Sequence, residues 1–141
     1  MRVKKQVLVR VKSTQVNQEG EIEAMELVTP GTFFIKGKNF YLLYNETELT
    51  GMEGTTTSLK IEPNRVTLNR MGTTAHRTTF EEGTWSSGLY VTPYGAIEMS
   101  VWSTKVEADL SEEGGSINLK YELQLDREKI SNNSLEITVE T

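Results

Sequence analysis

The sequence contains no cysteine and only one histidine, His76. Without cysteine there can be no disulfide framework, no thiolate nucleophile and no sulfur-ligated zinc or iron–sulfur cluster. Serine-type hydrolases need a base beside their nucleophile, but His76 stands among polar residues and is expected on the exposed side of a strand edge. We therefore assign no catalytic residue, no metal ligand and no cofactor, and whether the protein is an enzyme stays open.

The sequence also shows no phosphate-binding loop and no membrane helix. The glycine clusters at residues 51–54 and 114–115 do not precede a helical pattern, whereas phosphate loops need a helix N-terminus. No run approaches the roughly 20 apolar residues of a membrane span, and the apolar stretch near the start is too short for a secretion signal. A net charge of −5 gives no general attraction to nucleic acid or anionic lipid. These absences predict a cytoplasmic protein that binds neither nucleic acid nor membranes.

What the sequence does contain is alternation of apolar and polar residues. In residues 117–126 every odd position is apolar and every even position is polar, and residues 135–140 repeat the pattern. This period of two is typical of a strand with one buried face. Turn signals recur at short intervals and divide the chain into about ten strands. The sequence therefore predicts one all-β domain over residues 1–141, an antiparallel meander that forms a sandwich or a barrel.

The turn residues also suggest where individual strands end. Pro30-Gly31 is expected to break a strand into residues 21–29 and 32–36, and Asn132-Asn133 is expected to form a turn. Residues 47–54 are expected to form a loop with room for one helical turn. The remaining strands are expected at residues 6–12, 40–46, 55–62, 65–71, 76–80, 84–92, 97–110, 117–126 and 135–140.

Two features favour a closed barrel over a sandwich. In residues 97–110 the apolar positions change from odd to even, and one extra residue near Trp102–Lys105 would account for the change. Such a β-bulge lets a long strand bend around a barrel. Gly88 interrupts the preceding strand, where barrels tend to place a sharp bend.

The same alternation puts charged residues on apolar faces. Arg70 shares the face of Leu68, and Glu46 shares the face of Tyr44. A buried guanidinium without a partner is very costly, so three interpretations are open. Arg70 lies at the barrel mouth with its charge in water, forms an interior ion pair with Glu46 or Glu98, or anchors a bound anion.

The threonine-rich segments and the aromatic residues are interpreted as structural and not as parts of a binding site. The threonine-rich segments 55–58 and 73–74 suit either a polar lumen or a solvent-exposed strand face, and we favour the solvent-exposed face. The tyrosines and tryptophans of the strands are interpreted as core and rim packing.

A set of short motifs spans nearly the whole chain: Tyr44-x-Glu46, Gly54-Thr55-Thr56-Thr57-x-Leu59-Lys60, Arg70-x-Gly72, Phe80-x-x-Gly83, Tyr90-x-Thr92-Pro93-Tyr94-Gly95, Thr104 and Tyr121-x-Leu123. In order and spacing they resemble the YwiB-like family of uncharacterised bacterial proteins. The resemblance implies a calycin-like or lipocalin-like fold, an antiparallel meander barrel of eight to ten strands, and it implies no activity. It also adds further candidates for the lumen. The candidate ligand-binding residues are Tyr44, Glu46, Arg70, Tyr90 and Thr104, while Lys60 should point outward because its neighbours point inward.

Three functions remain open at this stage. The leading hypothesis is non-catalytic binding of a small, partly apolar or anionic molecule in the barrel lumen. The alternatives are a protein-interaction module with a filled barrel core, and an enzyme that uses the interior carboxylate of Glu46 together with Arg70. The volume of the lumen discriminates among them, because small-molecule pockets measure roughly 300–1,000 Å³. The ligand, the protein partners and the oligomeric state are not predicted.

Overall fold

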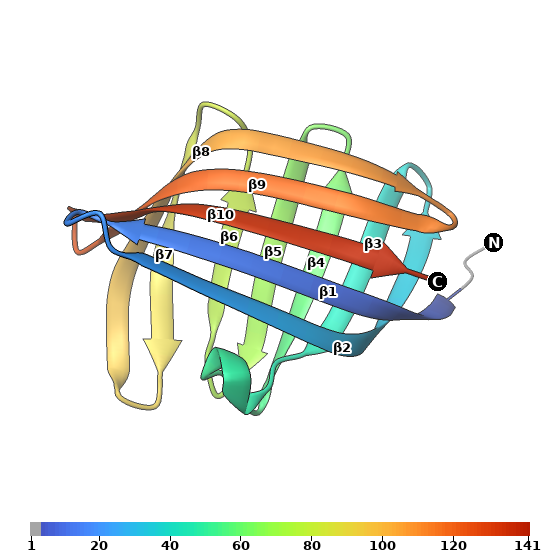
Figure 1. The fold of residues 1–141 in the computed structure, drawn as a ribbon, viewed down its shortest axis with the longest axis horizontal. Helices are drawn as coiled ribbons and strands as arrows, with labels where there is room; N and C mark the ends of the chain where they lie inside the picture. The colour runs from blue at the N-terminus through green and yellow to red at the C-terminus, as the bar shows by residue number, and fades with distance from the viewer. Residues whose placement is uncertain (1–3) are drawn as a thin grey trace.

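The computed structural model describes residues 4–141 (Figure 1), and within this range the chain forms ten strands and one short 3₁₀ helix. The elements are β1 (Lys4–Asn17), β2 (Ile22–Lys36), β3 (Asn39–Asn45), η1 (Glu48–Thr50), β4 (Thr55–Glu62), β5 (Arg65–Gly72), β6 (His76–Phe80), β7 (Trp85–Thr92), β8 (Gly95–Ser111), β9 (Gly114–Leu125) and β10 (Glu128–Glu140). No helix in this range is long and apolar enough to cross a membrane.

All ten strands belong to one antiparallel sheet with the order β6-β5-β4-β3-β2-β1-β10-β9-β8-β7. The long strands β1, β2, β8, β9 and β10 form one layer, and the shorter strands β3 to β7 cross behind them (Figure 1). Strands that follow one another in the sequence pair as hairpins, except β6 and β7, and the first and last strands pair where β1 lies against β10, with Leu8 opposite Glu140. The predicted meander is therefore confirmed.

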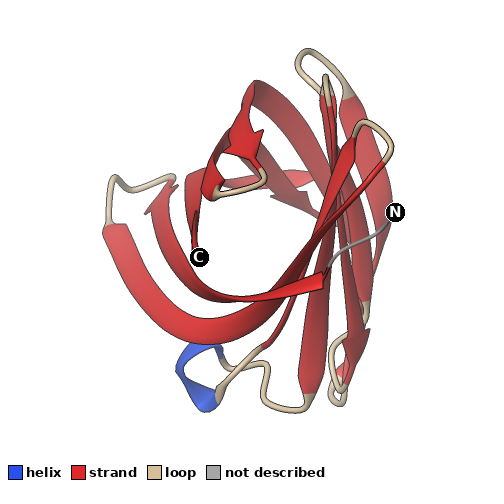
Figure 2. Cartoon of the chain, turned by 90° about the vertical axis from the view of Figure 1, so that its right-hand side faces the viewer, coloured by secondary structure: helices blue, strands red, loops and turns tan. Residues whose placement is uncertain are grey.

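The sheet curves around into a barrel (Figure 2), and its two edge strands, β6 and β7, come together and nearly close it. Ala75 and Val91 exchange two backbone hydrogen bonds of 2.8 and 2.9 Å. Farther along this seam the bond comes from a side chain, because the Thr79 N–H donates to Ser86 Oγ at 3.0 Å. The seam thus holds the nearly closed barrel with few backbone bonds, and the predicted barrel, as opposed to a sandwich, is confirmed.

The predicted β-bulge is present at Thr104. The register of β8 against β9 shifts between Ser103 and Lys105, so Thr104 has no partner across the ladder. Val101 is buried before the bulge and Val106 packs against the core after it, which accounts for the change of apolar positions. At Gly88, by contrast, the pairing of β7 with β8 runs without a register shift.

The predicted break at Pro30-Gly31 is wrong, because β2 continues through both residues. Pairing with β3 begins at Gly31, so this is where the strand starts to contribute to the second layer. A Cβ atom at Gly31 would lie 2.6 Å from Val9 Cγ2 and 2.9 Å from the Leu43 carbonyl oxygen. Glycine is thus needed for close approach inside a continuous strand and does not mark a turn.

The predicted turn at Asn132-Asn133 is also wrong, since both residues lie inside β10. The hairpin turn between β9 and β10 is formed by Asp126 and Arg127, whose φ angles of 49° and 69° are left-handed. Aspartate tolerates this conformation, but arginine carries no such signal in the sequence. The register also shifts between Lys129 and Ser131.

The interior of the barrel is apolar at one end and polar at the other. Along β1 the inward-facing residues change from Val7, Val9 and Val11, which are buried, to Ser13 and Gln15, which line a cavity. At the apolar end, side chains from most strands form one continuous core. Its largest fully buried members are Phe33, Leu27, Leu42, Leu59, Ile61, Ile117, Leu119 and Ile137. The polar end holds the candidate site.

Candidate functional site

The register of four neighbouring strands builds one polar row on the inner surface of the barrel. Tyr44 of β3 lies opposite Thr57 of β4, Thr57 lies opposite Arg70 of β5, and Arg70 lies opposite His76 of β6. Because side chains alternate between faces along each strand, these directly opposed residues share the inner face. Each of the three strand pairs therefore aligns polar side chains at the same level of the barrel.

This row borders a cavity of about 190 Å³ in the polar half of the barrel. The cavity is lined by the row residues Tyr44, Arg70 and His76, and also by Glu46. Facing strands contribute polar groups from other parts of the chain, namely Ser13, Gln15, Tyr121 and Asn133. The interior is therefore filled at one end and hollow around Arg70 at the other.

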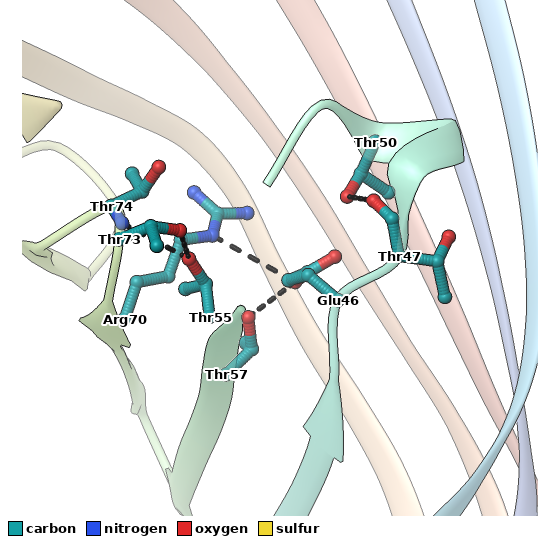
Figure 3. A network of polar contacts seen from close by, with 8 residues as sticks. All are labelled: Glu46, Thr47, Thr50, Thr55, Thr57, Arg70, Thr73 and Thr74. Atoms are coloured by element: carbon teal, nitrogen blue, oxygen red, sulfur yellow. Dashed lines mark hydrogen bonds and ion pairs between the residues drawn. The ribbon is translucent and has the colours of Figure 1, made fainter. Parts of the chain in front are cut away.

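Glu46 and Arg70 form an ion pair inside the barrel (Figure 3). Their Oε2 and Nε atoms are 3.9 Å apart, and the side chains are 3% and 20% exposed. The Thr57 hydroxyl donates a hydrogen bond to the same Glu46 oxygen. Among the three interpretations of Arg70, the interior ion pair is present, although its partners are too far apart for a hydrogen bond.

The guanidinium of Arg70 includes a hydrogen-bond donor that no described protein group uses. Its Nε atom is buried and has no hydrogen-bond partner among residues 4–141. A buried donor without a partner costs roughly 1–3 kcal/mol, and more when it is charged. Arg70 lines the cavity, so an acceptor bound there could form hydrogen bonds with its guanidinium group.

Tyr44 is almost fully enclosed and contributes a protonated phenol. Burial raises the pKa of Tyr44, and the nearby carboxylate of Glu46 raises the same pKa further. The hydroxyl group therefore keeps its proton at neutral pH and can donate a hydrogen bond. The prediction that Tyr44 and Glu46 face the interior agrees with their burial.

The expectation that His76 is exposed is wrong, since only 7% of its surface is accessible. Its Nε2 atom accepts a hydrogen bond from the Thr78 hydroxyl when Nδ1–H donates to the Leu89 carbonyl, 3.4 Å away. Burial lowers the pKa of His76, and the charge of Arg70 adds to this effect. The signal in the sequence was Phe80, an apolar residue of the same parity as His76 and Thr78.

Several threonines expected on the solvent face lie inside instead. Thr55 and Thr57 of β4 are buried, as is Thr74 before β6. The Thr55 hydroxyl accepts a hydrogen bond of 3.0 Å from the Thr74 N–H (Figure 3). Gly72 makes this packing feasible, because a Cβ atom there would lie 2.2 Å from the Gly54 carbonyl oxygen.

Of the remaining candidate residues, Tyr90 lies inside the barrel, whereas Thr104 and Lys60 lie outside. Tyr90 of β7 faces inward, and its ring centroid lies 5.5 Å from that of His76. Thr104 is exposed and does not line the cavity, and its hydroxyl donates to the Lys120 carbonyl oxygen at 3.1 Å. The prediction for Thr104 is wrong because it is the bulged residue. Lys60, flanked by buried Leu59 and Ile61, points outward as expected.

A second, larger pocket adjoins the first. It measures about 540 Å³, and it shares Met52, Arg70 and Met99 with the inner cavity. Tyr90 lines this outer pocket. Sequence reasoning missed it because it depends on the loop after η1 and on the turn between β7 and β8.

Metal binding finds no support in residues 4–141, where no group of three or more histidine, aspartate or glutamate side chains is placed to hold an ion. The arrangement offers instead a guanidinium with free donors, a buried carboxylate and two tyrosine hydroxyls around a small cavity. Chemically, it is suited to hold a polar group that is rich in hydrogen-bond acceptors.

Comparison with known proteins gives consistent matches. A family model described as a domain of unknown function, DUF1934, matches residues 9–137. The uncharacterized β-barrel protein YwiB of Bacillus subtilis (strain 168) is 26% identical over 134 residues, which cover 95% of this chain and 92% of that protein. The crystal structure of the B. subtilis ywiB protein superimposes with a TM-score of 0.86 at 24% identity, covering 97% of this chain and 92% of that one. The predicted resemblance and the barrel fold are therefore confirmed.

Proposed function

We propose that this chain, which belongs to the DUF1934 family of unknown function, binds a small carboxylate in the polar half of its barrel. The observation that carries the proposal is that Arg70, whose buried Nε atom has no hydrogen-bond partner among residues 4–141, lines a cavity of about 190 Å³. A buried charged donor without a hydrogen bond is costly to the protein, and a ligand acceptor in the cavity would give the guanidinium hydrogen bonds that the protein does not supply.

The balance of donors and acceptors favours a carboxylate. An arginine side chain has five N–H donors in a fork that matches a carboxylate, and it accepts nothing. Gln15, Asn133 and the phenols of Tyr44 and Tyr121 add further donors around the cavity. Of the described residues that line this cavity, Glu46 is the one carboxylate, and it already accepts from Thr57. A ligand that supplies acceptors therefore complements the site better than one that supplies donors.

The volume limits the size of the group that enters. An apolar cavity of about 150 Å³ engineered into another protein binds benzene, so a space of about 190 Å³ suits a group of roughly six to eight non-hydrogen atoms. This is smaller than the pockets that enclose drug-sized ligands. The proposal is therefore for a short acid or for the head of a longer one.

The test compares carboxylates with their neutral amides by thermal denaturation and isothermal titration calorimetry. The probes are propionate, isobutyrate and benzoate, each beside the corresponding amide. At about 100 times Kd a ligand stabilises the folded state by about 2.7 kcal/mol, so the acids should raise Tm by several degrees and the amides should not. The effect should disappear in Arg70→Gln and shrink in Arg70→Lys, which keeps the charge but loses the fork.

Arg77→Gln is the matched control, because Arg77 lies on the neighbouring strand β6 but is exposed on the outer face. Urea unfolding of each variant checks that it is folded before binding is measured. Equal shifts in Arg70→Gln and Arg77→Gln would mean that the acids bind elsewhere. The absence of any acid-dependent shift in the unaltered protein would refute the proposal.

A further inference from the structure

We infer that the ligand is an amphiphilic carboxylate, whose charged head enters the inner cavity at Arg70 while its apolar tail lies in the outer pocket. This inference rests on the proposed function, because it extends the same ligand from the same arginine. Its basis is the continuity of the two spaces, which share Met52, Arg70 and Met99. Arg70 therefore stands at the boundary between them.

The two spaces differ in character. The inner cavity has polar groups from several strands. The outer pocket of about 540 Å³ is lined mainly by apolar side chains, among them Ile97, Leu123 and Leu125. Within residues 4–141, Arg70 is the one charged residue in its lining. A molecule that occupies both must be polar at one end and apolar at the other.

The rim of the outer pocket carries an aromatic ring that the protein itself leaves uncovered. Tyr94, in the turn between β7 and β8, lines the pocket and is 99% exposed. Leu123 and Leu125, by contrast, face the barrel interior from β9 and contact the core. An apolar tail lying between this rim and the β9 side chains would remove apolar surface from water on both sides, which is favourable.

The boundary residues suit a passage between the spaces. Met52 belongs to the loop after η1 and Met99 to β8, and both line both spaces. Methionine side chains are unbranched and have three rotatable bonds, so they adapt to ligands of different shape. The tail can thus pass between two adaptable side chains while the head stays beside Arg70.

The inference is tested by titrating straight-chain carboxylates from propionate to decanoate, at concentrations where they do not aggregate. Each buried methylene contributes about 0.8 kcal/mol, so Kd should fall about fourfold per added carbon and then level off when the outer pocket is filled. Ile97→Glu places a charge in the outer pocket and should remove the gain with chain length.

Val91→Glu is the control, since Val91 lies on the neighbouring strand β7, is 39% exposed and lines neither space. It should keep the full dependence on chain length. If Ile97→Glu does not fold, Ala96→Glu serves instead, because Ala96 is exposed and lines the same pocket.

The outcomes separate this inference from the proposed function. Binding of propionate that depends on Arg70 but does not improve with chain length would overturn the amphiphile and leave the small carboxylate standing. An equal gain with chain length in Ile97→Glu would place the tail elsewhere and also overturn the inference. If neither short nor long acids bind, both proposals fall together.

Discussion

The Nε atom of Arg70 and the Oε2 atom of Glu46 lie 3.9 Å apart although their chain segments are separated by the whole of β4. Thr57 lies between them, opposite Arg70 in the sheet and hydrogen-bonded to Glu46. The pair is therefore fixed by strand register and by one bridging hydroxyl, and it lies at the wall of a cavity in the polar half of the barrel.

Replacing Arg70 by methionine should leave the Glu46 carboxylate buried without its counter-ion. Removing one partner of a buried pair costs about 3–5 kcal/mol, whereas replacing both partners is often neutral. Arg70 retains some exposure, so we expect a loss near the lower end, about 3 kcal/mol, in urea unfolding. The double variant with Glu46→Gln should recover most of that loss. A single-variant loss below about 1 kcal/mol would show that water already screens the pair.

The burial of His76 predicts a pH dependence of stability. Its folded pKa is lowered, so the unfolded chain binds the proton more readily as the pH falls below the ordinary value of about 6.5. The free energy of unfolding should therefore be fully maintained above this value and decrease as the pH falls toward the folded pKa. His76→Gln should flatten this part of the curve, measured by urea unfolding at several pH values. An unchanged slope in the variant would assign the pH dependence to other groups.

Gly31 and Gly88 form a natural pair for testing close packing between strands. A Cβ at Gly31 would approach Val9 Cγ2 to 2.6 Å, whereas at Gly88 the nearest atom, the Arg77 carbonyl oxygen, is 3.7 Å away. Gly31→Ala should cost about 1–3 kcal/mol through overpacking. Gly88→Ala should be neutral or stabilise by about 0.4–1 kcal/mol, because alanine restricts the unfolded chain. Chemical denaturation measures both, and equal effects would contradict the packing argument.

The bulge at Thr104 predicts unequal effects of two single-residue deletions in β8. Deleting Thr104 removes the unpaired residue, so Val106 still faces inward, and the main loss is the hydrogen bond to Lys120, about 1 kcal/mol. Deleting Glu107 shifts every later residue of the strand to the opposite face and turns Leu110 outward. Thermal melts should show a cooperative transition for the first variant and a far weaker or absent one for the second. Similar melts would argue against a fixed register in β8.

The strand pattern and the parity of side chains were largely accessible from the sequence. Alternation located Glu46 and Arg70 on the inner face because their strands carry clear apolar neighbours such as Leu42 and Leu68. The bulge was also predictable, since one inserted residue is the simplest way to change the parity within a single strand. The face of a strand on which a residue lies depends on its spacing from its neighbours along the chain, so these features follow from local sequence.

The errors arose where polar residues face inward or where one residue type serves two roles. His76 and Thr57 are buried because the lumen is polar at their level. Their parity with Phe80 and Leu59 was the available signal, but polar side chains lie more often on the solvent face. Asn133 lines the cavity from within a strand, although asparagine is typical of turns. Which groups meet across the barrel depends on how β1 and β10 pair, and local sequence does not encode that pairing.

That pairing has a consequence for how the chain folds. Apart from the β1–β10 ladder, neighbouring strands in the sheet follow one another along the chain, so their contacts are local. The β1–β10 ladder alone joins the two ends of the described chain, and its formation must bring together segments separated by most of the molecule. Non-local contacts of this kind slow folding. A circular permutant that links the ends and opens the turn at residues 81–84 would make this ladder local, and we expect it to fold faster than the natural chain.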